Sequence, residues 1–336
     1  MAALGVLVVL SVLGVGVLAG GAVGQGSAAL KADPAAAEAV DPTQSGEGEP
    51  TSRTAADASS SPPGRYKVVE AVRIKPAPEP KKERPSLAER AERARETTPS
   101  ISDFGVAMLN ILGSQHTAGA DGYASGTSRA YAATQMLLGR GASIIGFSEI
   151  QGDQLAVFTN NAPAFDVYPG TSLGSAGIPT SVAWDTRVWR LVSASTLTIP
   201  FSGQQRPSPV VRLANVATGA EVYVLNFHNS PGGMEGERDQ AQAIELAKIR
   251  ELEATGVPII VTGDFNEKME ALCAFTATSL QSAVGGGYCY PPPYSPRVDW
   301  IFASESFSVN SYEVTRAAPV PYITDHHALF ARLSLR

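Results

Sequence analysis

Four short segments after residue 140 bring together side chains whose chemistry suits a phosphate ester. They are residues 148–149 (Ser-Glu), 226–229 (Asn-Phe-His-Asn), 263–266 (Gly-Asp-Phe-Asn) and 324–326 (Thr-Asp-His). The first three follow apolar runs and the fourth precedes one, which predicts positions at the ends of buried strands. Two of the chain's four histidines lie in these segments. Carboxylates, amides and imidazoles together favour a metal ion that assists attack on a phosphate ester.

The carboxylate of Glu149 is the first candidate metal ligand. It follows an apolar run, so we expect it at the rigid end of a strand. Mg²⁺ binds one or two carboxylates together with water and substrate oxygens. Asn110, inside an earlier apolar run, can add a neutral oxygen ligand, and Asp325 is the third candidate. We therefore predict bound Mg²⁺, with Mn²⁺ or Ca²⁺ as alternatives.

Asp264 and Asn266 form a second candidate pair, this time for catalysis. They lie two residues apart, so on an extended backbone their side chains share one face. The carboxylate of Asp264 can accept a hydrogen bond and orient water, while the amide of Asn266 can donate to a phosphoryl oxygen. The sequence thus predicts both residues beside the reacting phosphorus.

Two imidazoles complete the candidate catalytic set. Asp325 and His326 are adjacent, and on a strand their side chains point in opposite directions and can serve different partners. Asp299 can hold the second nitrogen of a catalytic imidazole and raise its basicity. His228 is suited to stabilise or protonate the reacting oxygens.

The elements that must position these residues alternate between helix and strand after Phe104. Two hairpins mixed with flanking helices indicate an α/β sandwich of two mixed sheets. The expected strands are 106–112, 143–147, 257–262, 298–302 and 327–333. The expected hairpins pair 181–184 with 189–192 and 210–216 with 221–227. The expected helices are 128–138, 237–254 and one within 151–160.

Composition divides the chain at about residue 100. Residues 1–100 contain one aromatic residue, Tyr66, whereas residues 101–336 hold every Trp, Phe, His and Cys. A segment so poor in apolar side chains cannot bury a core, so we predict a disordered Pro/Ala/Glu-rich linker over 31–100 and one catalytic domain over 101–336. That domain carries the formal net charge of −6. An extended basic footprint for nucleic acid is absent, although a nuclease needs to grip only a few phosphates.

The first 30 residues predict export. Residues 2–30 carry no charge, and their long apolar run suits either a signal peptide or a membrane anchor. In an exported protein, the two cysteines, Cys273 and Cys289, predict a disulfide that closes a surface loop. We expect the catalytic domain to act outside the cytoplasm, in the extracellular space or at the cell membrane.

Taken in order, these motifs resemble those of the endonuclease/exonuclease/phosphatase superfamily, from about residue 106 to 333. The Gly-Asp-Phe-Asn motif is present letter for letter, and residues 299–301 (Asp-Trp-Ile) resemble the family's late Asp motif. The resemblance also covers Asn110, Glu149, His228, Asp325 and His326. The chain departs from the family at Ser148, where Gln is frequent.

The resemblance implies a four-layer, deoxyribonuclease-like sandwich. It also implies Mg²⁺ on Glu149, a nucleophile oriented by Asp264, and phosphate bound by Asn266. His228 and His326 would then transfer protons or stabilise the charge of the transition state, and Asp299 would support His326. The cysteine pair has a counterpart in secreted nucleases of the family.

The sequence as a whole predicts a monomeric, metal-dependent phosphoesterase that hydrolyses phosphodiester bonds, with nucleic acid ranked first as substrate. Phospholipid headgroups or small phosphate esters, as for sphingomyelinases or inositol phosphatases, are the alternative substrates. A surface binding module of the same fold without turnover is the alternative of a different class. The presence of a complete catalytic set argues against this alternative, since a binding module does not need every member of it. The set is Glu149, His228, Asp264, Asn266, Asp299 and His326.

Overall fold

The computed structural model describes residue 86 and residues 100–117, 123–293 and 298–335. The predicted signal or anchor at 1–30, and the predicted linker at 31–100 apart from residues 86 and 100, lie outside these described residues. Within the described part, no helix is both long enough and apolar enough to cross a membrane.

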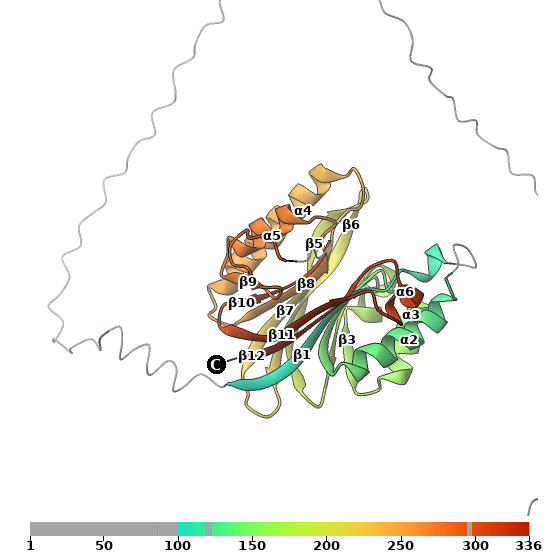
Figure 1. Ribbon diagram of the computed structural model, residues 1–336, viewed down its shortest axis with the longest axis horizontal. Helices are drawn as coiled ribbons and strands as arrows, with labels where there is room; N and C mark the ends of the chain where they lie inside the picture. Colours follow the sequence, from blue (N-terminus) through green and yellow to red (C-terminus); the bar gives the residue numbers. More distant parts are fainter. Residues whose placement is uncertain (1–85, 87–99, 118–122, 294–297, 336) are drawn as a thin grey trace, which may run out of the picture. The chain divides into compact units, whose positions relative to one another are not determined.

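Two six-stranded sheets form the centre of the domain (Figure 1). The first has the order β11-β12-β1-β2-β4-β3 and the second the order β5-β6-β7-β8-β10-β9. Each is mixed, because β1 and β2 pair in parallel, as do β7 and β8, while the other pairs are antiparallel. The strand bounds are β1 Ile101–Asn110, β2 Ala142–Ser148, β3 Phe165–Tyr168, β4 Thr180–Asp185, β5 Trp189–Phe201, β6 Gln204–Asn215, β7 Glu221–His228, β8 Ile259–Asp264, β9 Leu280–Ser282, β10 Asp299–Ser304, β11 Phe307–Thr315 and β12 Ala328–Leu335.

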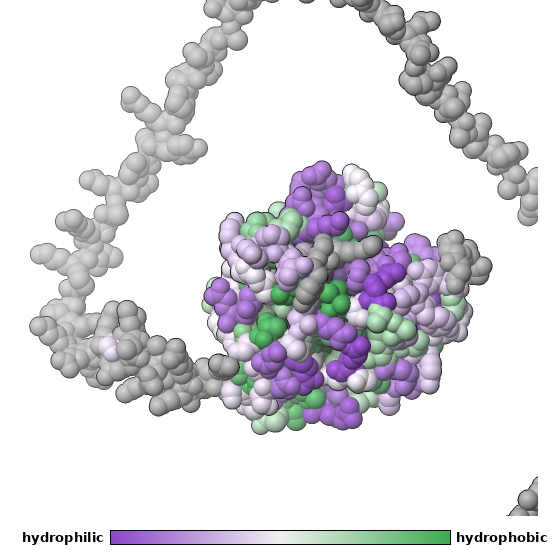
Figure 2. Space-filling model, in the orientation of Figure 1, coloured by the Kyte–Doolittle hydropathy of each residue, from purple (hydrophilic) through white to green (hydrophobic). Residues whose placement is uncertain are grey.

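Helices cover the outer face of each sheet. In Figure 1, α2, α3 and α6 lie on one side of the domain, and α4 and α5 lie on the other. The hydrophilic residues at the top of Figure 2 lie over α4, whose other side buries Ile249 and Leu252. The helix bounds are α2 Gly126–Gly139, α3 Gly152–Asn161, α4 Glu235–Glu253, α5 Met269–Thr276 and α6 Val320–Ile323, with short 3₁₀ segments η1 Ser114–His116 and η2 Gly170–Ala176.

Alternation along the strands produces three apolar clusters and hence four layers. Val106 and Met108 of β1 point between the sheets, whereas Ala107 and Leu109 point toward the helices. The other sheet repeats the pattern, with Ile260 between the sheets and its neighbours packed against α4 and α5. Successive residues of a strand face opposite sides, so both faces of each sheet are buried. The predicted four-layer α/β sandwich is confirmed.

The two sheets approach each other closely at Gly146 of β2. A Cβ atom there would lie 2.1 Å from Thr262 Oγ1 and 2.4 Å from Asn226 Oδ1. Thr262 Oγ1 donates to Asn226 Oδ1, and Asn226 Nδ2 donates to the Phe147 carbonyl oxygen across the sheets. Asn226 and Thr262 each lie two residues before a candidate site residue, His228 and Asp264. This buried pair of hydrogen bonds therefore fixes the two sheets relative to each other close to the strand ends that carry the site.

Most predicted elements are present, with shifted ends, but one predicted pairing is wrong. Residues 181–184 and 189–192 do not form a hairpin: β4 pairs with β2 and β3, whereas β5 pairs with β6. The turn after Asp185 instead carries the chain from the first sheet to the second. Trp184 and Trp189, on either side of it, are both buried between the sheets. Burial of the two indoles, rather than local pairing, therefore decides the path.

The predicted disulfide between Cys273 and Cys289 is present. It joins α5 to the glycine-rich segment after β9, and the backbone N–H of Cys289 donates to Thr276 Oγ1 of the same helix. A disulfide that closes a loop of this size stabilises a fold by about 3 kcal/mol in the chain-entropy view.

Gly146→Ala tests the tight approach of the sheets. The added methyl group meets two buried side chains, so we expect it to lower the free energy of unfolding by about 1–3 kcal/mol, as overpacking does. Gly139→Ala, at the open end of α2 with no atom within 4 Å of its Cβ position, is the matched control and should be neutral or slightly stabilising. Thermal and denaturant unfolding measure both; equal effects would contradict the account.

Candidate active site

The residues predicted to do chemistry meet at one edge of the sheet pair. Asn110 ends β1, Glu149 follows β2, His228 ends β7 and Asp264 ends β8. Because β1–β2 and β7–β8 are parallel pairs, their carboxyl ends lie together. Strand β10 is antiparallel to β8, so its first residue, Asp299, stands opposite Asp264 in register. His326, two residues before β12, reaches the same edge.

The amide of Asn110 links the two sheets at this edge. Its Nδ2 atom lies 3.0 Å from Glu149 Oε1 and 2.9 Å from Asp264 Oδ2, and both contacts have donor geometry. Its Oδ1 atom accepts from the backbone N–H of Leu112 at 3.1 Å. In this arrangement Asn110 donates to carboxylates, and a ligand role for it requires the amide to turn over. That predicted role stays a prediction.

Glu149 is held in an unusual backbone conformation. Its φ of 63° lies in the left-handed region, which a non-glycine residue adopts at a cost of about 1 kcal/mol or more. Glu149 Oε2 accepts from the Gly113 backbone N–H at 3.2 Å, and His116 Nε2 lies 3.5 Å away. The strained backbone turns the carboxylate away from the sheet and into the cavity described below.

Asp264, Asp299 and His326 form a cluster in which both carboxylates are buried and the imidazole is half-buried. His326 Nδ1 lies 2.9 Å from Asp299 Oδ2 and 3.7 Å from Asp264 Oδ2. Burial opposes the charge on His326, but attraction to Asp299, Asp264 and Asp325 outweighs it and raises its pKa to about 10. Burial, and then the charge of Asp299, raise the pKa of Asp264. The contact between Asp299 and His326 is the one that the sequence analysis expects.

Asn266 and Asp325 do not lie as the sequence predicts. Asn266 has a left-handed backbone with φ of 51°, so it and Asp264 do not share the face of an extended strand. Its backbone N–H donates to Asp264 Oδ1, and its Nδ2 donates to the Asn229 carbonyl oxygen at 2.8 Å. Asp325 and His326 lie in the connection before β12 rather than on the strand. The irregular backbone at Asn266 and at Asp325 and His326, not strand alternation, orients these side chains.

His228 is buried and contacts a residue that the sequence analysis missed. Its Nδ1 lies 3.1 Å from Arg206 Nη1, and its Nε2 lies 3.6 Å from Asp264 Oδ2. Burial, followed by the positive charges of Arg206 and His326, lowers the pKa of His228 well below its ordinary value. Arg206 follows no apolar run and no motif, so nothing in its sequence surroundings indicated a place in the site.

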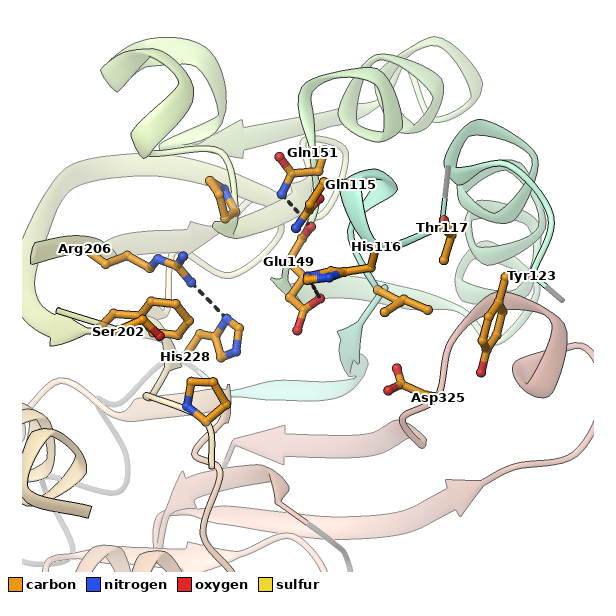
Figure 3. A pocket seen from close by; sticks show the side chains of 14 residues that line it. Gln115, His116, Thr117, Tyr123, Glu149, Gln151, Ser202, Arg206, His228 and Asp325 are labelled. Carbon is orange, nitrogen blue, oxygen red and sulfur yellow. Dashed lines mark hydrogen bonds and ion pairs between the residues drawn. The ribbon is translucent and has the colours of Figure 1, made fainter. Parts of the chain in front are cut away.

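A cavity of about 570 Å³ opens beside these groups. Figure 3 shows Glu149 near its middle, with His228 and Arg206 on one side and Asp325 and Tyr123 on the other. Gln115, His116 and Gln151 lie around Glu149 and add two amides and an imidazole to the wall. The cavity therefore joins two carboxylates, an arginine and two imidazoles in a space of ligand size.

The donors around the cavity fit a hard divalent cation. Glu149 and Asp325 offer carboxylate oxygens to the cavity, and such oxygens are the ligands that Mg²⁺ and Mn²⁺ take. A second group, Asp264, Asp299 and His326, offers three atoms within 4.8 Å of one another. In that group, however, His326 already forms an ion pair with Asp299, and both carboxylates are buried.

A model of the Endonuclease/Exonuclease/phosphatase family matches residues 109–326, and the chain belongs to this family. Its members are phosphoesterases, and they typically depend on a divalent metal. No curated protein sequence matches the chain.

Three solved structures illustrate the similarity of fold. A mannosyl-6-phosphatase of Bacteroides thetaiotaomicron is 20% identical, with a TM-score of 0.56, and the match covers 68% of this chain and 99% of that one. The human nocturnin catalytic domain with bound sulfate is 17% identical with a TM-score of 0.58, over 72% and 99%. D. rerio TDP2 with a single-strand DNA product is 14% identical with a TM-score of 0.54, over 69% and 99%. At these identities they establish the fold alone.

Replacing Asp299 by Asn should lower the pKa of His326 from about 10 toward the ordinary 6.5, because the strongest attraction to its charge is lost. Titration of the histidine resonances by NMR measures the change. In the wild type the folded pKa exceeds the unfolded one. The stabilisation from protonated His326 is therefore complete below about pH 6.5 and disappears as pH rises through about 10. An unchanged His326 pKa in the variant would contradict the pairing.

Proposed function

We propose that the domain is a metal-dependent phosphoesterase that hydrolyses phosphodiester bonds, with nucleic acid as its first-ranked substrate. The observation that carries the proposal is the convergence of Asn110, Glu149, His228, Asp264 and His326 beside one cavity. A binding module gains nothing from a buried carboxylate held between two imidazoles, whereas hydrolysis uses both kinds of group.

In this proposal Glu149 and Asp325 hold the cation, and Mg²⁺ is the expected ion. Asn110 keeps the Glu149 carboxylate in place through its Nδ2 hydrogen bond. When bound, such an ion neutralises phosphate charge and polarises the phosphorus–oxygen bonds.

Asp264 is the base that orients the attacking water and takes its proton as the new phosphorus–oxygen bond forms. Its raised pKa suits it to that proton. The ester bond to the leaving oxygen breaks on the opposite side of phosphorus. Protonated His326 and neutral His228 then stabilise the negative charge that develops on the phosphoryl and leaving oxygens.

Nucleic acid ranks first because an enzyme displayed outside the cell would meet free DNA. The uncharged segment at residues 2–30 and the disulfide support a location in the extracellular space or at the cell membrane. TDP2, which shares the fold, was solved with a single-strand DNA product.

A small organic phosphate is the second candidate, because the cavity itself favours it. Its volume suits a ligand of a few hundred daltons, and Arg206 is the one Arg or Lys among the described residues that line it. Its remaining wall includes Gln115, Gln151 and Tyr123, which suit an uncharged hydrogen-bonding group. The fold of a mannosyl-6-phosphatase is similar.

The test uses the purified full chain with supercoiled plasmid, bis-p-nitrophenyl phosphate, p-nitrophenyl phosphate and phospholipid vesicles, each with Mg²⁺, Mn²⁺ or EDTA. We expect metal-dependent nicking of plasmid and faster cleavage of the diester than of the monoester. Turnover of monoesters alone would replace the nuclease by the small-phosphate enzyme. No turnover of any phosphate ester would overturn the proposal.

Glu149→Ala should lower the metal-dependent activity by about two orders of magnitude or more, because the bound ion stabilises the charge of the transition state by several kcal/mol. Glu251→Ala is the matched control, since this exposed residue on α4 pairs with Lys248 outside the cavity. Equal activity of the two variants would remove Glu149 from the site.

A further inference from the structure

The tip of the hairpin between β5 and β6 contributes two residues to the site. The guanidinium carbon of Arg206 lies 3.4 Å from the centre of the Phe201 ring. Phe201 in turn meets the ring of His228 edge-on, with 4.7 Å between centroids. The third contact, between Arg206 Nη1 and His228 Nδ1, closes the group. We call Phe201, Arg206 and His228 the arginine clamp; Figure 3 shows Arg206 directed at the His228 ring.

The hairpin tip is itself anchored to the segment that follows His228. The backbone N–H of Ser202 donates to Ser230 Oγ at 3.0 Å, and that of Gly203 donates to Glu237 Oε1 at 2.9 Å. Ser230 Oγ donates to the other oxygen of Glu237 at 2.6 Å. Glu237 therefore connects the hairpin to the start of α4. These hydrogen bonds fix the backbone of the hairpin tip, and with it the position of Arg206 beside His228.

The hydrogen bond between Arg206 and His228 can have only one direction. A guanidinium has N–H donors and no acceptor, so His228 Nδ1 must accept. A neutral imidazole that accepts at Nδ1 carries its proton on Nε2. The Nε2 atom lies 3.6 Å from Asp264 Oδ2, toward the carboxylate that is proposed to orient water.

We propose that Arg206 is a positioning residue that fixes His228 as the Nε2–H tautomer, so that His228 donates a hydrogen bond to the reacting phosphoryl group and does not act as a base. The opposite tautomer would place an Nδ1–H against the Arg206 N–H at 3.1 Å, with two donors facing each other. The catalytic half of this inference rests on the proposed function, whereas the tautomer does not.

The tautomer is measured directly on the full chain labelled with ¹⁵N-histidine. The chain has only four histidines, and His228→Asn identifies the resonances of His228. We expect an unprotonated-type Nδ1 resonance and a protonated-type Nε2 resonance for neutral His228. In Arg206→Met, which removes the donors but keeps an unbranched apolar chain, a tautomer mixture should appear while the other histidine signals stay in place.

Kinetics test the consequence. Arg206→Met should lower kcat by about 10–100-fold, as the loss of a hydrogen bond that orients an active-site imidazole does, with a smaller change in KM. Arg206→Lys keeps a charged donor and should restore part of both kcat and the tautomer. Arg212→Met is the matched control: this arginine also lies on β6 over an aromatic ring, that of Tyr223, but does not line the cavity.

The outcomes distinguish failure of the positioning role of Arg206 from failure of the proposed function. An Nδ1–H tautomer in the wild type, or an unchanged tautomer and kcat in Arg206→Met, would overturn the positioning role. A fall in kcat with the tautomer unchanged would also overturn it, since Arg206 would then act only on the substrate. A wild type that hydrolyses no phosphate ester would contradict the proposed function, and the spectra would still decide the tautomer.

Discussion

The geometry of the site depends on one buried amide. Asn110 ends a strand of the first sheet and Asp264 ends a strand of the second, and the Asn110 Nδ2 atom donates to Asp264 and to Glu149. A hydrogen bond from an amide to a buried carboxylate is worth about 1.5–3 kcal/mol, and leaving such a carboxylate unpaired costs more. The amide therefore fixes the distance between two acidic groups that would otherwise repel each other. The close approach of the sheets at Gly146 supplies the rigid base for this contact.

Charge is distributed unevenly around this amide. His326 is held protonated by Asp299, whereas His228 is kept neutral by burial and by Arg206. The same residue type thus has two states within one site, set by an acidic neighbour in one case and a basic neighbour in the other. Strain collects there too: Glu149 and Asn266 both adopt left-handed backbone conformations. Such conformations persist only where the surrounding structure enforces them, which is typical of functional sites.

The sequence was sufficient to place the strand-end residues, because an apolar run followed by a polar residue marks where a strand leaves the core. It was not sufficient for Asn266, whose side chain is turned by backbone rather than by strand alternation. Arg206 could not be found from the sequence, since it follows no apolar run and reaches His228 only in the folded sheet, where β6 lies beside β7. Edge strand β11 was missed because polar, exposed residues such as Ser311 and Glu313 interrupt its apolar pattern. Pairing of β4 with β5 was predicted from proximity in sequence, but burial of two tryptophans between the sheets prevailed.

The central claim is that Glu149 directs a divalent cation into the cavity between His228 and Asp325. The most direct measurement is a crystal structure of the protein soaked in Mn²⁺, with anomalous difference maps collected at the manganese edge. The account predicts a peak at coordinating distance from the Glu149 carboxylate that is missing in Glu149→Ala crystals. A peak within the Asp264, Asp299 and His326 cluster instead, or no peak at either place, would contradict it.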